Sequence, residues 1–177
     1  QQTGIVWFND RQTAQDVGMS FVNGFFMPEV ISLLSGPLAN ETIKSTGEKA
    51  PESDTWALLI RLGGGVRSIE RQVNEVVGAA GSNNAAGYAV LNDVGANSAW
   101  AKLDDAESTS NLSARMTSLP VAALNASHAI RSEVSNKGHS DISTICDLGF
   151  GALTILASTR SEEDSISITN SFVTEVK

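Results

Sequence analysis

The sequence predicts an α+β domain in which central amphipathic helices pack on a small antiparallel sheet. Through the middle of the chain, apolar residues recur every three or four positions, which is the period of a helix. Near both ends, short segments rich in β-branched and aromatic residues favour strands. Helices between terminal strands are typical of the α+β class. The length of 177 residues suits one domain, 1–177, with a sizeable core.

The first quarter of the chain predicts a strand, a helix and a long loop. Residues 4–8 are apolar and end at Asn9-Asp10, which is typical of a short strand followed by a turn. From residue 13 the apolar positions take helical intervals, and Pro28 either interrupts or restarts this helix. We expect another helical turn or two over residues 29–34. Residues 38–53 lack periodicity and contain helix breakers, so they predict a loop.

Residues 53–81 give the clearest helical pattern, and we expect them to form the central core helix. The apolar stripe consists of Leu59, Leu62, Val66, Ile69, Val73 and Val76. Three glycines at positions 63–65 interrupt this pattern, and each costs roughly 1 kcal/mol relative to alanine inside a helix. The sequence therefore predicts either a break at the triplet or a very close backbone contact there.

The second half of the chain predicts further helices and then a C-terminal β-hairpin. Residues 85–106 carry a moderate helical signal. Residues 111–134 carry a clearer one, which Pro120 either kinks or restarts. Residues 150–157 are mostly apolar, and residues 165–177 alternate between apolar and polar side chains, which is a strand period. With the charged segment 161–164 as a turn, these two segments predict the hairpin, which the N-terminal strand could join.

The overall charge excludes one broad class of function. Twenty acidic and twelve basic residues give a net charge of −8. A general nucleic-acid binder needs clustered Lys and Arg to neutralise phosphates, so we expect no nucleic-acid partner. No apolar run reaches the roughly 18–20 residues that a membrane-spanning helix needs. We therefore expect no membrane span.

The sequence predicts no catalytic, cofactor-binding or metal-binding residues. His139, Asp141 and Cys146 are the one neighbourhood where nucleophile or zinc chemistry could arise. Their spacing matches no known zinc or catalytic-cysteine pattern, and the apolar neighbours of Cys146 predict a buried thiol. His128 is expected at or near the surface. No phosphate-binding loop, dinucleotide fingerprint or exposed-serine elbow is present. We expect no cofactor.

Three sequons and the first residue favour an extracellular or cell-surface location. The triplets begin at Asn40, Asn111 and Asn125, and each would accept a glycan in a secreted eukaryotic protein. Chance occurrence is the alternative, because the chain is rich in Ser, Thr and Asn. The chain begins with Gln1, which removal of a signal or propeptide would explain.

Two functional hypotheses follow. The first is a non-enzymatic secreted or surface-displayed structural or interaction protein, which is a homo-oligomer or binds a protein partner. Its terminal strands offer a route to self-assembly. Adjacent Phe25 and Phe26 cannot both face one core stripe, so one of them is expected to be exposed. The alternative is a small secreted hydrolase or toxin-like effector. Its site would converge only in the fold, where His128 or His139 meets a carboxylate and a hydroxyl or thiol.

Overall fold

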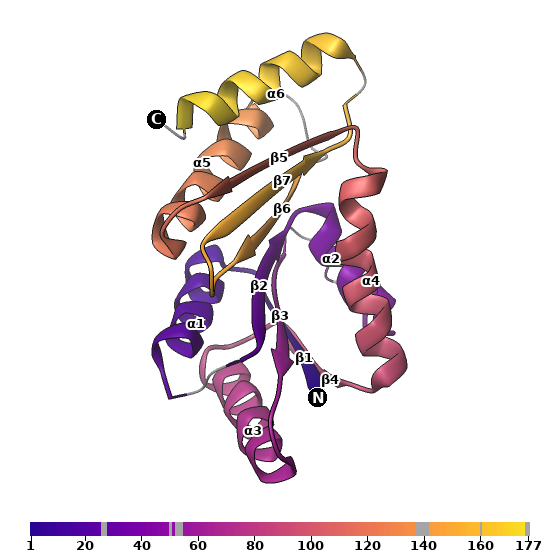
Figure 1. The fold of residues 1–177 in the computed structure, drawn as a ribbon, viewed down its shortest axis with the longest axis vertical. Helices are drawn as coiled ribbons and strands as arrows, with labels where there is room; N and C mark the ends of the chain where they lie inside the picture. Colours follow the sequence, from indigo (N-terminus) through magenta and orange to yellow (C-terminus); the bar gives the residue numbers. More distant parts are fainter. Residues whose placement is uncertain (26–27, 50, 52–54, 137–141, 160, 176–177) are drawn as a thin grey trace.

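The computed structural model shows an α+β fold with helices on both faces of an antiparallel sheet (Figure 1). The structure describes residues 1–25, 28–49, 51, 55–136, 142–159 and 161–175. The strands are β1 (Gln2–Phe8), β2 (Val30–Ser35), β3 (Trp56–Leu62), β4 (Gly87–Leu91), β5 (Leu112–Thr117), β6 (Ile142–Asp147) and β7 (Ala152–Ala157). The helices are α1 (Arg11–Asn23), α2 (Pro37–Ser45), α3 (Val66–Ser82), α4 (Asp93–Thr109), α5 (Pro120–Asn136) and α6 (Glu162–Glu175).

The seven strands found in these ranges form one sheet in the order β4-β1-β3-β2-β6-β7-β5. Every neighbouring pair is antiparallel. The sheet is thus much larger than the small terminal sheet that the sequence predicted. Strands β4 and β5 form its edges, whereas the N-terminal strand β1 is paired on both sides.

Two groups of helices cover the two faces of the sheet. Helices α1, α3 and α5 lie on one side, and α2 and α4 lie on the other (Figure 1). The larger core lies on the first side, where Phe8, Leu58 and Ile130 are almost fully buried. The second core joins α2 and α4 to β1 and β3 through side chains such as Ile5 and Leu59. Strand β3 is therefore buried on both faces, and the sheet forms the centre of the molecule.

Several predictions of local structure are confirmed. Residues 4–8 lie in β1, and the helix expected from residue 13 is α1, which begins at Arg11. Pro120 starts a new helix, where its missing N–H costs nothing. The triplet at 63–65 breaks the predicted helix: β3 ends at Leu62, Gly64 takes a φ of 114°, and α3 begins at Val66.

The prediction of a central helix over residues 53–81 is wrong in its first half. Residues Trp56–Leu62 form β3, and residues 52–54 lie outside the described part of the chain. A strand that is buried on both faces shows no polar–apolar alternation. The spacing of Leu59 and Leu62 then fits a helix by coincidence. Helix α3 buries Val76 but exposes Val66, so β3, not this helix, forms the centre of the core.

The predicted C-terminal hairpin is also wrong. Residues 162–175 form helix α6, and residues 176–177 lie outside the described part. Strand β7 instead pairs with β6 on one side and β5 on the other. The acidic residues expected in a hairpin turn lie at the start of α6, where negative charge interacts favourably with the helix dipole.

Three other segments differ from their predictions. Residues 29–34 are mostly strand β2, and the loop expected at 38–53 is helical as far as Ser45. The segments at 85–106 and 111–134 each begin with a strand, β4 and β5, before the expected helix. Among the described helices, none is both long and apolar enough to cross a membrane, in agreement with the sequence.

Candidate binding site

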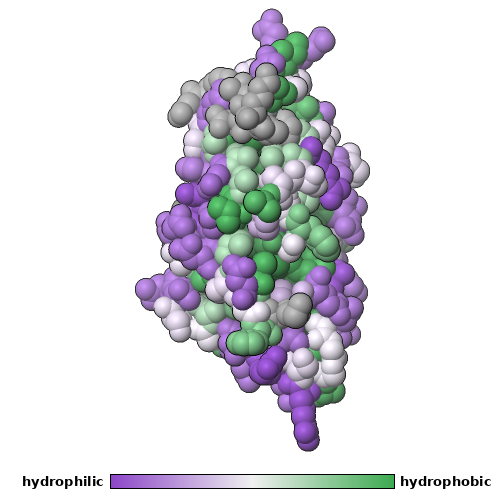
Figure 2. Space-filling view, turned by 60° about the vertical axis from the view of Figure 1, so that its left-hand side comes forward, coloured by the Kyte–Doolittle hydropathy of each residue, from purple (hydrophilic) through white to green (hydrophobic). Residues whose placement is uncertain are grey.

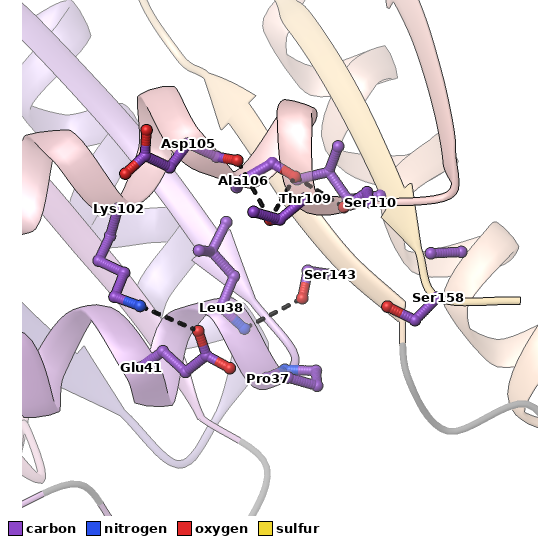
Figure 3. A pocket seen from close by; sticks show the side chains of 12 residues that line it. Pro37, Leu38, Glu41, Lys102, Asp105, Ala106, Thr109, Ser110, Ser143 and Ser158 are labelled. Atoms are coloured by element: carbon purple, nitrogen blue, oxygen red, sulfur yellow. Dashed lines mark hydrogen bonds and ion pairs between the residues drawn. The ribbon is translucent and has the colours of Figure 1, made fainter.

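A pocket of about 400 Å³ lies where α2, the end of α4, and strands β6 and β7 meet (Figure 3). Its apolar floor consists of Leu38, Ala106 and Leu156, which pack on one another. Polar side chains surround this floor. They are Glu41, Lys102, Asp105, Thr109, Ser110, Ser143 and Ser158. The composition suits recognition of a polar molecule or loop that carries a small apolar group.

The start of α2 is held against β6 by a serine. Pro37 occupies the first turn of α2, after Gly36, and no side chain of the preceding residue caps the helix. The backbone N–H of Leu38 donates a 3.0 Å hydrogen bond to Oγ of Ser143 instead (Figure 3). Ser143 is buried, so it satisfies an N–H at the helix start that would otherwise lack an intrahelical partner.

Two other hydroxyls of this pocket bond to the end of α4. Thr109 Oγ1 donates to the carbonyl of Asp105 at 3.1 Å, and Ser110 Oγ donates to the carbonyl of Ala106 at 2.7 Å. These bonds satisfy carbonyls in the last turn of the helix. Two turns earlier in α4, Lys102 Nζ lies 3.7 Å from Glu41 Oε2, and both side chains are about half exposed. Such an exposed ion pair contributes little to stability.

The described residues that line this pocket include no histidine and no cysteine. Its titratable side chains are Glu41, Lys102 and Asp105, of which Glu41 and Lys102 pair with each other. A separate hydroxyl cluster joins Ser35, Thr144 and Ser127 at 2.6 and 3.0 Å. It is buried between α5 and the sheet.

The structure separates the residues that the sequence singled out for chemistry. Cys146 is buried in β6, and burial, with a smaller contribution from the charge of Asp147, raises its pKa to about 12. His139 and Asp141 lie outside the described residues. His128 is exposed on α5, where partial burial and then the charges of Arg11 and Arg131 lower its pKa. Within the described part of the chain, no three His, Cys, Asp or Glu residues could hold a metal ion together.

The three sequon asparagines lie in different settings. Asn111 is exposed just before β5, and its Nδ2 donates to the carbonyl of Thr159 at 2.9 Å. Asn125 is exposed on α5. Asn40 is only partly exposed on α2, and its Oδ1 is buried without a hydrogen-bond partner among the described residues. Glycosylation of these residues stays a prediction.

The aromatic residues are mostly in the core. Trp7, Trp56 and Phe21 are buried, whereas Trp100 is partly exposed. Phe25 is 99% exposed at the end of α1, so one member of the Phe pair does face outward, as expected. Phe26 lies outside the described residues.

The comparisons with known proteins show similarity of fold. No family model matches the sequence, and no curated protein matches it. Among solved structures, alkyldihydroxyacetonephosphate synthase has a similar fold, with a TM-score of 0.52 and 12% sequence identity. The match covers 99% of this chain and 38% of that synthase. The whole fold described above therefore corresponds to about two fifths of a longer enzyme chain.

Proposed function

We propose that this chain is a non-catalytic recognition domain that works against a catalytic domain or subunit of an enzyme. The fold match carries this proposal, because the entire fold has its counterpart in one part of a much longer synthase. In this arrangement the partner supplies the reacting groups and any cofactor, and this chain supplies a recognition surface.

An exposed apolar surface supports a protein partner. We call Leu119, Val121 and Phe150 the apolar tip; their side chains are 78%, 50% and 82% exposed. The backbone N–H of Ser118 donates to the carbonyl of Gly151 at 2.9 Å, which places Leu119 and Phe150 at the same end of the sheet. Figure 2 shows hydrophobic residues gathered along the middle of one face, between hydrophilic flanks. Apolar surface of this kind is typical of an interaction site.

A charge on the apolar tip tests the proposal. We expect Phe150→Asp to leave the chain folded but to weaken its association with the catalytic part of its natural enzyme, and to lower the activity of the assembly. Val66→Asp is the matched control, because Val66 is 74% exposed on α3. Light scattering measures association and circular dichroism measures folding. Unchanged association and activity of Phe150→Asp would count against the proposal.

The secreted, self-assembling role predicted from the sequence is the second proposal. Sequons at Asn111 and Asn125 support it, since both side chains are exposed. Assembly through terminal strands would need another route, because β1 is internal and the C-terminal segment is α6. The outer strands β4 and β5 are the edges that could pair with a second copy. A monomer in light scattering at high concentration would remove this proposal.

The hydrolase hypothesis gains no support from the described residues. It required a pocket in which His128 or His139 meets a carboxylate and a hydroxyl or thiol. His128 lines neither the candidate site nor the pockets beside α1 and α3 and at the start of α4. Its neighbouring charges are the two arginines Arg11 and Arg131. His139 lies outside the described residues.

A further inference from the structure

A second polar pocket, of about 360 Å³, lies at the opposite end of α4 from the site described above. It forms where the N-terminus, the end of β4 and the start of α4 come together, at the lower end of the sheet in Figure 1. Its lining residues are Gln1, Gln2, Thr3, Arg61, Leu91, Asp93, Ala96, Asn97 and Trp100. Its volume is within the range of small-molecule sites.

Arg61 is the unusual residue of this pocket. It lies in β3, opposite Thr3 of β1 and Val30 of β2, on a sheet face that is otherwise mostly apolar. The guanidinium carbon lies 4.3 Å from the centre of the Trp100 ring. Among the residues that the structure describes, no carboxylate lies within ion-pair distance of Arg61. An arginine that loses part of its hydration is stabilised by an anionic partner.

The stack on Trp100 fixes the arginine without using its hydrogen-bond donors. A cation–π contact uses the face of the indole ring, and the five N–H groups of the guanidinium remain suited to an acceptor. Trp100 is itself held, because its Nε1–H donates to Oγ1 of Thr3 at 3.1 Å. The side-chain amide of Gln2 donates to the carbonyl of Leu91 and ties β1 to the end of β4. The guanidinium is therefore positioned by surroundings that are themselves anchored.

We propose that this pocket binds the carboxylate group of a small monoanionic molecule through Arg61. A carboxylate matches the planar fork of a guanidinium and accepts two parallel hydrogen bonds. Asp93 lines the same pocket, so a second negative charge on the ligand would be repelled. Asp93 also has a structural role in the first turn of α4, where it interacts with the helix dipole. This inference stands independently of the partner domain proposed above.

A second arginine–tryptophan stack provides the control. Arg131 lies 5.0 Å from the centre of the Trp56 ring, and neither residue lines the pocket of Arg61. If stacking alone produced an anion site, both tryptophans would respond to a carboxylate. If the pocket produces it, only Trp100 will respond.

The experiment is a titration of the purified chain with sodium acetate, at constant ionic strength, followed by the indole N–H signals of its three tryptophans in NMR. Trp100→Phe identifies the signal of Trp100. We expect that signal to shift with saturation, whereas those of Trp7 and Trp56 stay in place. Arg61→Gln should weaken binding roughly tenfold or more, as loss of a charge-assisted pair does. Arg61→Lys should be intermediate, because it keeps the charge without the fork.

The controls distinguish carboxylate binding at Arg61 from non-specific binding of anions elsewhere on the chain. Arg131→Gln should bind acetate as the unmodified chain does, and the neutral analogue acetamide should cause no saturable shift. An equal response to sulfate, or unchanged binding by a folded Arg61→Gln variant, would overturn the proposal. If Arg61→Gln does not fold, the Arg61→Lys variant and the acetamide comparison carry the test. Acetamide binding as tightly as acetate would then overturn it.

Discussion

Gly36 lies so close to β6 that a Cβ atom at this position would be 2.1 Å from the carbonyl oxygen of Ile142. Gly36 also has a φ of 74°, a backbone conformation that residues other than glycine rarely adopt. The residue joins the end of β2 to the start of α2. Close approach of two backbones therefore sets where α2 begins and brings Pro37 and Leu38 to the candidate binding pocket.

Gly36→Ala should destabilise the fold by about 2–5 kcal/mol, because backbone strain and a clash with main-chain atoms act together. Gly47→Ala is the matched control: Gly47 has a φ of 88°, but a Cβ atom at this position would have nothing within 4 Å. It should cost only about 1–2 kcal/mol from strain. Chemical denaturation measures the free energy of unfolding of both variants. Equal costs for the two variants would show that the contact with Ile142 is unimportant.

Ser143→Ala tests how the candidate pocket is held together. Removing Oγ leaves the N–H of Leu38 without its acceptor in a buried position, which should cost about 1–2 kcal/mol. Ser158→Ala is the control, because Ser158 lines the same pocket but is exposed. It should change the free energy of unfolding by less than about 0.5 kcal/mol. A Ser143→Ala variant as stable as Ser158→Ala would contradict the capping role.

The sequence predicted elements correctly where one local pattern was enough. Strand β1 is a short run rich in β-branched and aromatic residues, and helix α1 has apolar residues at helical spacing. Strand β5 also carries one, since Leu112, Ala114 and Met116 alternate with more exposed residues. That alternation is hard to detect because the helical pattern of the adjoining α5 extends backwards over it. Strand β3 has no such signal, because neighbours on both faces, distant in sequence, bury it.

Helix α6 shows why alternation alone does not predict a strand. Ile166 and Ile168 share a parity, so a strand would place them on one face. In a helix, side chains two residues apart are separated by roughly 200° around the helix axis, so they point to nearly opposite sides. The structure buries Ile168 and leaves Ile166 54% exposed, which fits the helix. As a helix, the segment needs only one buried stripe against α5. The acidic residues at its start favour the N-terminus of a helix.

The candidate pocket could not be predicted from the sequence, because α2, α4, β6 and β7 converge through sheet order alone. Strand β6 lies beside β2, although more than a hundred residues separate Ser35 from its partner Thr144. One local signal was present: Gly36 followed by Pro37 is compatible with a helix start, because proline is favoured in the first turn. The same two residue types also commonly follow a helix end, so this signal does not decide between the two.

Asp10→Ala should lower the melting temperature by removing the cap of α1. Thr13 donates to Asp10 from its hydroxyl at 2.6 Å and its backbone N–H at 2.7 Å, and these bonds lower the pKa of Asp10 below its ordinary 3.8. Because the folded-state pKa is lowered, the stabilisation is complete above pH 3.8 and is lost as the pH falls through the folded value. The difference in melting temperature between the unmodified chain and Asp10→Ala should therefore narrow as the pH falls through the folded-state pKa of Asp10.

Asp10→Asn is the control for this pH dependence. Asparagine still accepts a hydrogen bond at a helix start but does not titrate. Its advantage over Asp10→Ala should therefore stay constant through the acidic range. Melting curves for the three chains, recorded on both sides of pH 3.8, measure the effect. A gap for the unmodified chain that does not change with pH would show that the charge of Asp10 plays no part.

Cys146 should make the fold less stable at alkaline pH. Burial, and to a smaller extent the charge of Asp147, raises the pKa of the thiol from 9.0 to about 12. A raised folded-state pKa means that its stabilising contribution is complete below pH 9 and declines as the pH rises toward 12, because the unfolded chain loses the proton first. The decline should approach roughly 1.4 kcal/mol per pH unit.

Cys146→Ala lacks the titrating group, so its stability should fall less steeply over the same range. Denaturation at a series of pH values compares the two slopes, and equal slopes would mean that Cys146 does not titrate as a buried thiol.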